Sequence, residues 1–256
     1  MNCHKGLRDP FFYCIICPYI HRRLPMDLAE FKQKFETIKA KGFIKSHRKG
    51  DTGVGHTLEQ ELGLTENCIS GPDLGKYELK AARRGAGGKQ TFFNKEGDWV
   101  VSQRDYLKTY GFPHTEHIGE TSGQCTVTKN VNKRGLSIVT TDDYCAVAHG
   151  DTIIVKWDWE TLIDQYEIKF PACIKVIADV EIRDGVEYFH YNEANFYVNG
   201  DKNKIRTAIE NGHMIIDLRL YTNGIQKNGK VRLRNRGTSL RMNHNKMEEL
   251  FIKEEF

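Results

Sequence analysis

The sequence of 256 residues has no apolar run that approaches the roughly 18 residues of a membrane span. The longest candidate, residues 11–20, is too short and contains Pro18. That segment also lacks the small-residue cleavage site of a secretory signal. We therefore expect a soluble, cytoplasmic protein that does not associate with membranes.

Internal repeats and linker-like segments are also missing, which predicts one domain rather than an array. An apolar content of 39% excludes wholesale disorder. Cysteine is present in an odd number, seven, and four of these residues are scattered singly: Cys68, Cys125, Cys145 and Cys173. Without a secretion signal, we expect the cysteines to be reduced and mostly buried.

Residues 1–25 differ from the rest of the chain and contain a set of side chains that resembles a zinc site: Cys3, His4, Cys14, Cys17 and His21. Structural zinc sites usually have four tetrahedral ligands from two paired knuckles, and the second pair is missing here. We expect a poorly ordered N-terminal extension, with zinc binding as the alternative.

Positive charge is concentrated in three stretches without acidic residues, at 39–49, 80–89 and 227–241. The net charge of +4 is by itself too small to indicate a nucleic-acid partner. The segregation is nevertheless what a phosphate-facing surface needs, because Lys and Arg displace the counterions condensed on DNA. One such cluster is equally typical of a solvated loop, but three together favour nucleic-acid binding.

Hydrophobic periodicity predicts an α/β domain with a mixed sheet. Asp27 is expected to cap a first helix that ends at Gly42, and two Asn-Gly turns introduce a basic ribbon at 230–243. Residues 85–150 look loop-rich. The other expected elements are strands at 77–81, 152–157, 174–182, 186–191 and 214–221, and helices at 57–62, after Asp201 and at 246–252.

The stretch that carries chemistry is Gly-Pro-Asp-Leu-Gly-Lys-Tyr-Glu-Leu-Lys, residues 71–80. It places Asp73 at a turn, and it places Glu78 and Lys80 on one face of a strand, because residues i and i+2 share a face. Glu59, on the preceding helix, offers a third acid. Carboxylates this close repel one another, so a hard cation such as Mg²⁺ is expected between them.

These groups suit phosphodiester hydrolysis. A divalent ion can neutralise charge on the phosphate and lower the pKa of a bound water. Lys80 would orient or help to deprotonate that water and would hold the developing negative charge. The pattern alone is a weak signal, because a Glu-x-Lys pair on a strand is usually part of a solvated face.

Longer runs around this motif resemble the MvaI/BcnI family of type II restriction endonucleases, PD-(D/E)XK nucleases related to the mismatch-repair nickase MutH. The similarity covers nearly everything from Met26 onward, in order and at compatible spacing. The matching runs are Arg48–Glu59, Gly71–Asp73, Tyr77–Lys80, Tyr188–Phe196, Ala208–Gly212, Ile216–Arg219 and Gly237–Asn243.

The resemblance implies a restriction-endonuclease-like (PD-(D/E)XK) core, a central mixed β-sheet flanked by helices, in one domain over 26–256. The catalytic core would occupy about 26–200 and a DNA-recognition ribbon about 222–243. Asp73 and Glu78 would be the Mg²⁺ ligands, with Glu59, Asp73, Glu78 and Lys80 as the catalytic set.

The resemblance also implies a monomer that acts on double-stranded DNA. Such an enzyme would cut one strand at a time, at a short CC-N-GG-like site, and would have a cognate DNA methyltransferase as its companion. Two other functions remain as alternatives: a MutH-like nickase that needs an activating partner, and a DNA-binding protein without catalysis.

Basic and amide side chains in these stretches are the candidate DNA contacts: Arg48, Lys49, Arg83, Arg84, Arg232, Arg234, Asn235, Arg236 and Arg241. The family resembled carries histidines where this chain has residues 234–236, Arg-Asn-Arg. Arginine suits guanine and asparagine suits adenine, so the base preference stays open. For Arg83 and Arg84, DNA contact (phosphate or minor groove) and simple solvation are equal alternatives.

Overall fold

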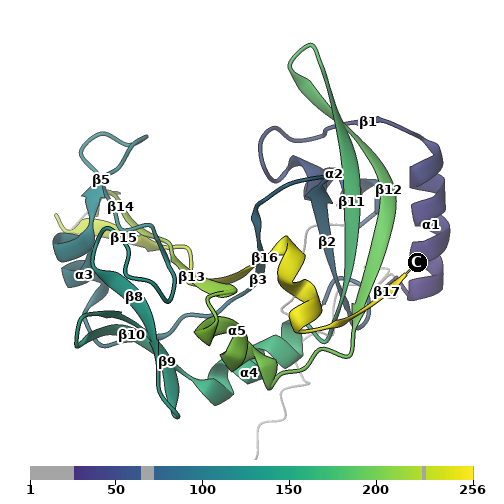
Figure 1. Ribbon diagram of the computed structural model, residues 1–256. Coiled ribbons are helices and arrows are strands. Elements are labelled where there is room, and N and C mark those ends of the chain that lie inside the picture. Colours follow the sequence, from purple (N-terminus) through teal and green to yellow (C-terminus); the bar gives the residue numbers. More distant parts are fainter. Residues whose placement is uncertain (1–25, 65–71, 227–228, 256) are drawn as a thin grey trace, which may run out of the picture.

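The computed structural model describes residues 26–64, 72–226 and 229–255. The N-terminal extension, with its candidate zinc ligands, lies outside the described residues. Within these ranges, two lobes stand on either side of a central sheet (Figure 1). We call them the motif lobe, which contains Asp73, and the hairpin lobe, which contains the strands at 220–225 and 231–235. None of the described helices has the length and apolar character of a membrane span.

Two helices of the motif lobe precede the chemical motif. Helix α1 (Leu28–Ala40) begins after Asp27, whose side chain accepts a hydrogen bond from the Glu30 amide at 2.8 Å, as predicted. Helix α2 (Gly53–Leu62) starts four residues earlier than predicted. Its first glycine is required by a close approach, because a Cβ at Gly53 would lie 2.5 Å from the Arg48 carbonyl oxygen.

The sheet of the motif lobe contains the longest strands of the described chain. Strands β2 and β11 run parallel and the other neighbours run antiparallel, which makes the sheet mixed, as predicted. Asp184 and Gly185, both with positive φ, form the predicted turn between β11 and β12. In order across the sheet, the strands are β1 (Ile44–Lys45), β12 (Val186–Val198), β11 (Ala172–Arg183) and β2 (Tyr77–Arg83), with β17 (Ile252–Glu255) also beside β12.

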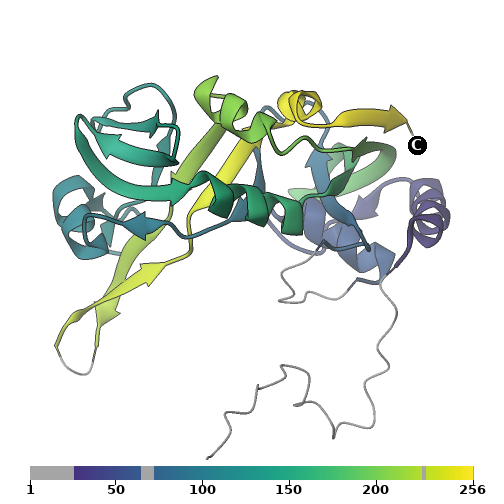
Figure 2. The same ribbon diagram turned by 90° about the horizontal axis from the view of Figure 1, so that it is seen from below.

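The central sheet consists of β3 (Lys89–Asn94), β16 (Ser239–Asn243), β13 (Met214–Leu218) and β7 (Cys125–Val127). Helix α4 (Trp159–Lys169) crosses from the hairpin lobe to the motif lobe beneath it (Figure 2). Buried aromatic side chains of α4 and the neighbouring strands, such as Tyr166, fill the larger of two apolar cores. The smaller core lies between α1, α2 and the mixed sheet.

Of two expected C-terminal helices, the one after Asp201 is confirmed with a different first residue, and the other was wrong. Helix α5 (Lys204–Glu210) begins after Asn203 rather than at Asp201, whose carboxylate instead accepts a hydrogen bond from the Asn203 amide. The helix predicted at 246–252 is a short 3₁₀ helix, η1 (His244–Glu249), because the chain then extends to pair β17 with β12.

The prediction of a loop-rich segment at 85–150 was also wrong. Strands of two to six residues and one helix occupy much of it, and several of these strands pair with segments that are distant in sequence. The hairpin lobe combines most of them with later strands. It contains α3 (Gln103–Tyr110) and two sheets. The first sheet has the order β4 (Asp98–Trp99), β10 (Thr152–Asp158), β9 (Tyr144–His149) and β8 (Leu136–Thr140), and the second β15 (Val231–Asn235), β14 (Leu220–Ile225), β6 (Thr121–Ser122) and β5 (Phe112–Pro113).

The strand predicted at 214–221 is divided at Arg219 into β13 and β14, which belong to different sheets. The side chain of Arg219 donates hydrogen bonds to the carbonyl oxygens of Arg236 (2.6 Å) and Gly237 (2.9 Å) and to Asn94 Oδ1 (2.9 Å). These bonds attach the base of the β14–β15 hairpin to the central sheet.

The basic ribbon is therefore formed by β14 and β15, and not by residues 230–243. Asn223 and Gly224 lie within β14, where the pairing with β15 shifts register, so the first expected Asn-Gly turn is wrong. The second expected turn includes Asn228, which lies outside the described residues. Strand β16, which carries Arg241, pairs with β13 and β3 in the central sheet.

Candidate active site

A tight turn brings Asp73 back alongside β2, as its position before the strand predicted. Leu74 and Tyr77 exchange backbone hydrogen bonds of 2.9 and 2.8 Å across the turn. Gly75 occupies the left-handed region between them, with φ of 57°. The Asp73 carboxylate then accepts a hydrogen bond from the Leu79 amide at 3.0 Å, which holds it beside the first residues of the strand.

Glu78 and Lys80 form an ion pair on one face of β2, with Lys80 Nζ 2.5 Å from Glu78 Oε1. The Glu78 side chain is only 2% exposed. A second ammonium, that of Lys169 at the end of α4, lies 2.9 Å from Glu78 Oε2. The sequence analysis missed Lys169, because only the parallel pairing of β2 with β11, the strand after α4, brings it to the motif.

The pKa values show that Asp73, Glu78 and Lys80 form one electrostatic cluster. Burial raises the pKa of Glu78, and the Asp73 carboxylate raises it further, against the opposing effect of Lys80 and Lys169. Burial alone would lower the pKa of Lys80, but its ion pair and hydrogen bond with Glu78, helped by Asp73, raise it instead. Lys80 is therefore charged at neutral pH and suited to stabilise an anion.

The chemistry of this donor set fits a hard divalent ion such as Mg²⁺, which commonly takes one or two carboxylates and keeps several waters. Asp73 and Glu78 supply two carboxylates that act on each other electrostatically. In the described ranges, no group of three or more Asp, Glu, His or Cys side chains is placed to hold a metal ion. Glu59 thus does not join the other two acids in such a group; it lies on α2, which packs beside β2.

Arg83 and Arg84, at the end of β2, both have carboxylate partners within the motif lobe. Arg83 forms a bidentate pair with Glu187, at 2.8 and 2.7 Å, and also donates to two carbonyl oxygens of the loop before α2. Arg84 donates to three side chains of β11 and β12: Asp179, Asn192 and Glu193. These pairs compensate both guanidinium charges.

Arg48 and Lys49, in contrast, are exposed on the loop that precedes α2. Arg241 lies in the central sheet, where its guanidinium contacts Asp217 Oδ2 at 2.6 Å and the Lys89 carbonyl oxygen at 2.7 Å. Of these three predicted DNA contacts, only Arg241 is held by hydrogen bonds within the central sheet.

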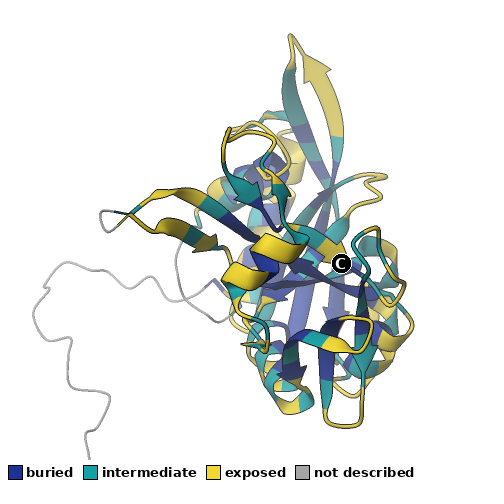
Figure 3. Ribbon diagram, turned by 90° about the vertical axis from the view of Figure 1, so that its left-hand side faces the viewer, coloured by how far each residue is buried: buried dark blue, intermediate teal, exposed yellow. Residues whose placement is uncertain are grey.

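The outer part of the β14–β15 hairpin is exposed (Figure 3), and the exposed arginines are Arg232 and Arg234 of β15 and Arg236 just after it. Among the residues described, none forms a hydrogen bond or ion pair with the side chain of Arg232 or Arg234. Arg236 lies over the ring of Tyr221, 5.3 Å from its centroid, and Asn235 accepts a hydrogen bond from the Gly237 amide at 2.7 Å. The hairpin projects on the same side of the molecule as α2 (Figure 2).

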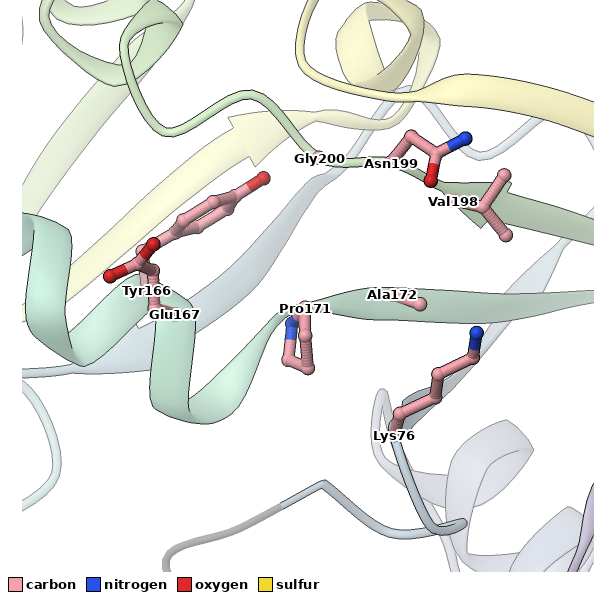
Figure 4. Close-up of a pocket in the computed structure, with 8 residues that line it drawn as sticks. All are labelled: Lys76, Tyr166, Glu167, Pro171, Ala172, Val198, Asn199 and Gly200. Atoms are coloured by element: carbon pink, nitrogen blue, oxygen red, sulfur yellow. The ribbon is translucent and has the colours of Figure 1, made fainter.

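A cavity of about 320 Å³ opens where β2 and β11 begin, but Asp73, Glu78 and Lys80 do not line it. The candidate active site is therefore defined by the cluster on β2 and not by this cavity. Figure 4 shows the lining residues, which are Lys76, Tyr166, Glu167, Pro171, Ala172, Val198, Asn199 and Gly200.

Comparisons with known proteins show the fold and the family of this chain. The chain has the fold of restriction endonuclease MvaI in a complex with cognate DNA substrate, with a TM-score of 0.72 and 22% identity over 88% of this chain and 96% of that one. For MvaI in the absence of DNA, the TM-score is 0.51, with 19% identity over 90% and 98% of the two chains. No curated protein matches the sequence significantly.

The fold is thus that of a restriction endonuclease. The sequence model of the MvaI/BcnI restriction endonuclease family matches residues 32–251, and the chain belongs to this family. The protein is a type II site-specific deoxyribonuclease, and the restriction endonuclease family generally uses a divalent metal ion.

Proposed function

We propose that this nuclease hydrolyses DNA phosphodiester bonds with Mg²⁺ held by Asp73 and Glu78. The observation that carries the proposal is the meeting of Asp73, Glu78 and Lys80 at the start of β2, with Lys80 Nζ 2.5 Å from Glu78. Family membership makes DNA the substrate. The similar fold of a nuclease in complex with cognate DNA supports the same substrate.

When bound, Mg²⁺ would neutralise charge on the scissile phosphate and make a bound water more acidic. Lys80, charged at neutral pH, donates hydrogen bonds to the phosphate and orients the attacking water. Glu78 fixes the position of this ammonium through the short ion pair. The Leu79 amide orients Asp73, and Glu59 is the additional acid from α2.

Recognition is assigned to the β14–β15 hairpin and the residue after it. Arg232, Arg234, Asn235 and Arg236 would read base edges of a short CC-N-GG-like site, because the three arginines are exposed and the asparagine lies between them. Arg48 and Lys49 would contact backbone phosphates near the cleavage site. The ion pairs of Arg83, Arg84 and Arg241 support a role in holding the DNA-facing strands in place.

The described chain holds one cluster of this kind, and one cluster can hydrolyse one phosphodiester bond at a time. This supports a monomer that nicks double-stranded DNA before it completes the break. A cytoplasmic enzyme of this activity would also attack the host genome. We therefore propose a cognate DNA methyltransferase as its functional companion.

The test is cleavage of unmodified plasmid DNA in the presence of Mg²⁺. The wild-type protein should produce nicked circles first and then linear fragments with discrete ends, whereas EDTA should prevent both. Lys80→Ala should reduce the cleavage rate by about 10²–10⁴-fold and retain DNA affinity. Lys202→Ala, which removes a surface lysine paired with Glu167, serves as the control. Cleavage by Lys80→Ala at the wild-type rate would refute the role of the lysine.

A further inference from the structure

Lys169 is the second ammonium at the Glu78 carboxylate, and it is held there by a rigid part of the fold. It is the last residue of α4, where a positive charge is favoured by the helix dipole. The next residue, Phe170, is fully buried and stacks on Phe92 with ring centroids 4.4 Å apart. The end of α4 is thereby fixed, and with it the lysine 2.9 Å from Glu78 Oε2.

Each oxygen of Glu78 consequently contacts an ammonium group. Lys80 contacts Oε1 and Lys169 contacts Oε2, so the metal-free carboxylate, 2% exposed, is enclosed by two positive charges. A Mg²⁺ ion bound to Glu78 would have to approach to about 2.0–2.1 Å of a carboxylate oxygen. It would then lie within a few ångströms of the Lys169 charge, which repels it.

The net charge of the four groups determines how favourable Mg²⁺ binding is. Asp73 and Glu78 carry two negative charges, and Lys80 and Lys169 carry two positive charges, so the metal-free set is neutral. Addition of Mg²⁺ leaves this set with two uncompensated positive charges. A DNA phosphate brings one negative charge, which reduces this excess from two positive charges to one, and it can also pair with the ammonium that the metal ion repels.

We propose that Lys169 is a positioning residue that makes Mg²⁺ binding depend on DNA. In the metal-free protein it replaces the cation and holds Glu78 in place. Its charge keeps the affinity for Mg²⁺ low until a scissile phosphate enters the site. Because coupling between two ligands is reciprocal, Mg²⁺ strengthens DNA binding to the same extent. This inference rests on the assignment of Asp73 and Glu78 as the metal ligands.

The test is a titration of the DNA-free protein with Mg²⁺. The thermal unfolding temperature is measured at each Mg²⁺ concentration, because it rises when a ligand binds the folded state. Lys169→Met should lower the Mg²⁺ concentration at half-saturation about fivefold to tenfold, because a nearby positive charge is removed. Lys169→Arg keeps the charge and should restore the wild-type midpoint. Lys202→Met, on the surface beside the same helix, should leave the midpoint unchanged. Should Lys169→Met fail to fold, Lys169→Gln replaces it in the same measurement.

Three outcomes separate the assignments. A lower Mg²⁺ midpoint in Lys169→Met, but not in Lys169→Arg or Lys202→Met, supports the inference. If Lys169→Met lowers the unfolding temperature but leaves the Mg²⁺ midpoint unchanged, the lysine is merely structural and the inference is overturned, while the metal ligands stand. If Mg²⁺ stabilises neither the wild type nor Lys169→Met, or stabilises Glu78→Gln as much as the wild type, the proposed metal site is itself wrong.

Discussion

The start of β2 and the β14–β15 hairpin hold their charged side chains in different ways. At β2, Glu78 is buried, both its oxygens contact lysines, and Asp73 accepts a backbone hydrogen bond. On the hairpin, Arg232 and Arg234 are exposed, with no hydrogen-bond or ion-pair partner among the described residues. The charges of the first region are paired within the protein, whereas in the described chain the guanidinium donors of Arg232 and Arg234 are not.

The difference matches two physical tasks. Groups that stabilise a transition state work best when the protein has already fixed their positions, so that no energy is lost in reorganisation. Groups that read bases must keep their donors available, because a donor already paired inside the protein gains little from DNA. Substitutions in the two regions should therefore change different measured quantities.

The largest effect is expected at β2. Glu78→Gln removes a proposed metal ligand and the charge that fixes Lys80, so single-turnover cleavage should fall by at least about 10³-fold. The affinity for the cognate duplex, measured without metal, should change only slightly. Glu167→Gln, on the exposed side of α4, provides a control that keeps full activity. Equal losses of cleavage and of DNA affinity would contradict the separation of the two regions.

A smaller effect, on sequence discrimination, is expected at the hairpin. Arg234→Ala should reduce the preference for the cognate over a one-base-pair variant site by about 1–3 kcal/mol, that is, by about 5–150-fold. Lys49→Ala should weaken binding to both duplexes equally and reduce the salt dependence by about one phosphate contact. Equilibrium binding at several salt concentrations measures both. If Arg234→Ala also weakens all duplexes equally, Arg234 contacts phosphate and the bases are read elsewhere.

The smallest effect concerns the junction between the two regions. Burial, with the charges of Lys175 and Arg241, lowers the pKa of His244 to about 4. The unfolded chain therefore binds a proton at this residue between about pH 6.5 and 4, whereas the folded protein does not. Folding should lose about 2 kcal/mol of stability as the pH falls from 7 to 4.5. Urea unfolding of the wild type and of His244→Gln measures this loss, and equal pH dependence in both proteins would exclude His244 as its source.

Local patterns predicted the chemical motif well. The turn at Asp73 and the shared face of Glu78 and Lys80 depend on a few neighbouring residues, so strand periodicity was sufficient. The capped helix α1 and the turn at Asp184 follow for the same reason. Patterns of neighbouring residues therefore predict local geometry.

Features that depend on distant partners could not be predicted. Lys169 reaches Glu78 only through the crossover by α4, and Arg83 finds Glu187 only through the register of the mixed sheet. Several strands within 85–150 are only two or three residues long, which is too short to show periodicity, and some of them pair with distant segments. The alternation at 214–221 continues through Arg219, although the chain changes sheets there.

Arg219 has a consequence for where this enzyme cuts. Its guanidinium joins the base of the hairpin to Asn94 at the end of β3 in the central sheet, and β3 directly follows β2, the strand that bears Lys80, in the chain. The proposed recognition hairpin and the proposed catalytic groups are thus joined through one connected framework. If both assignments hold, the distance between the recognised bases and the scissile bond is set by the protein, and each selected site should be broken at one fixed offset.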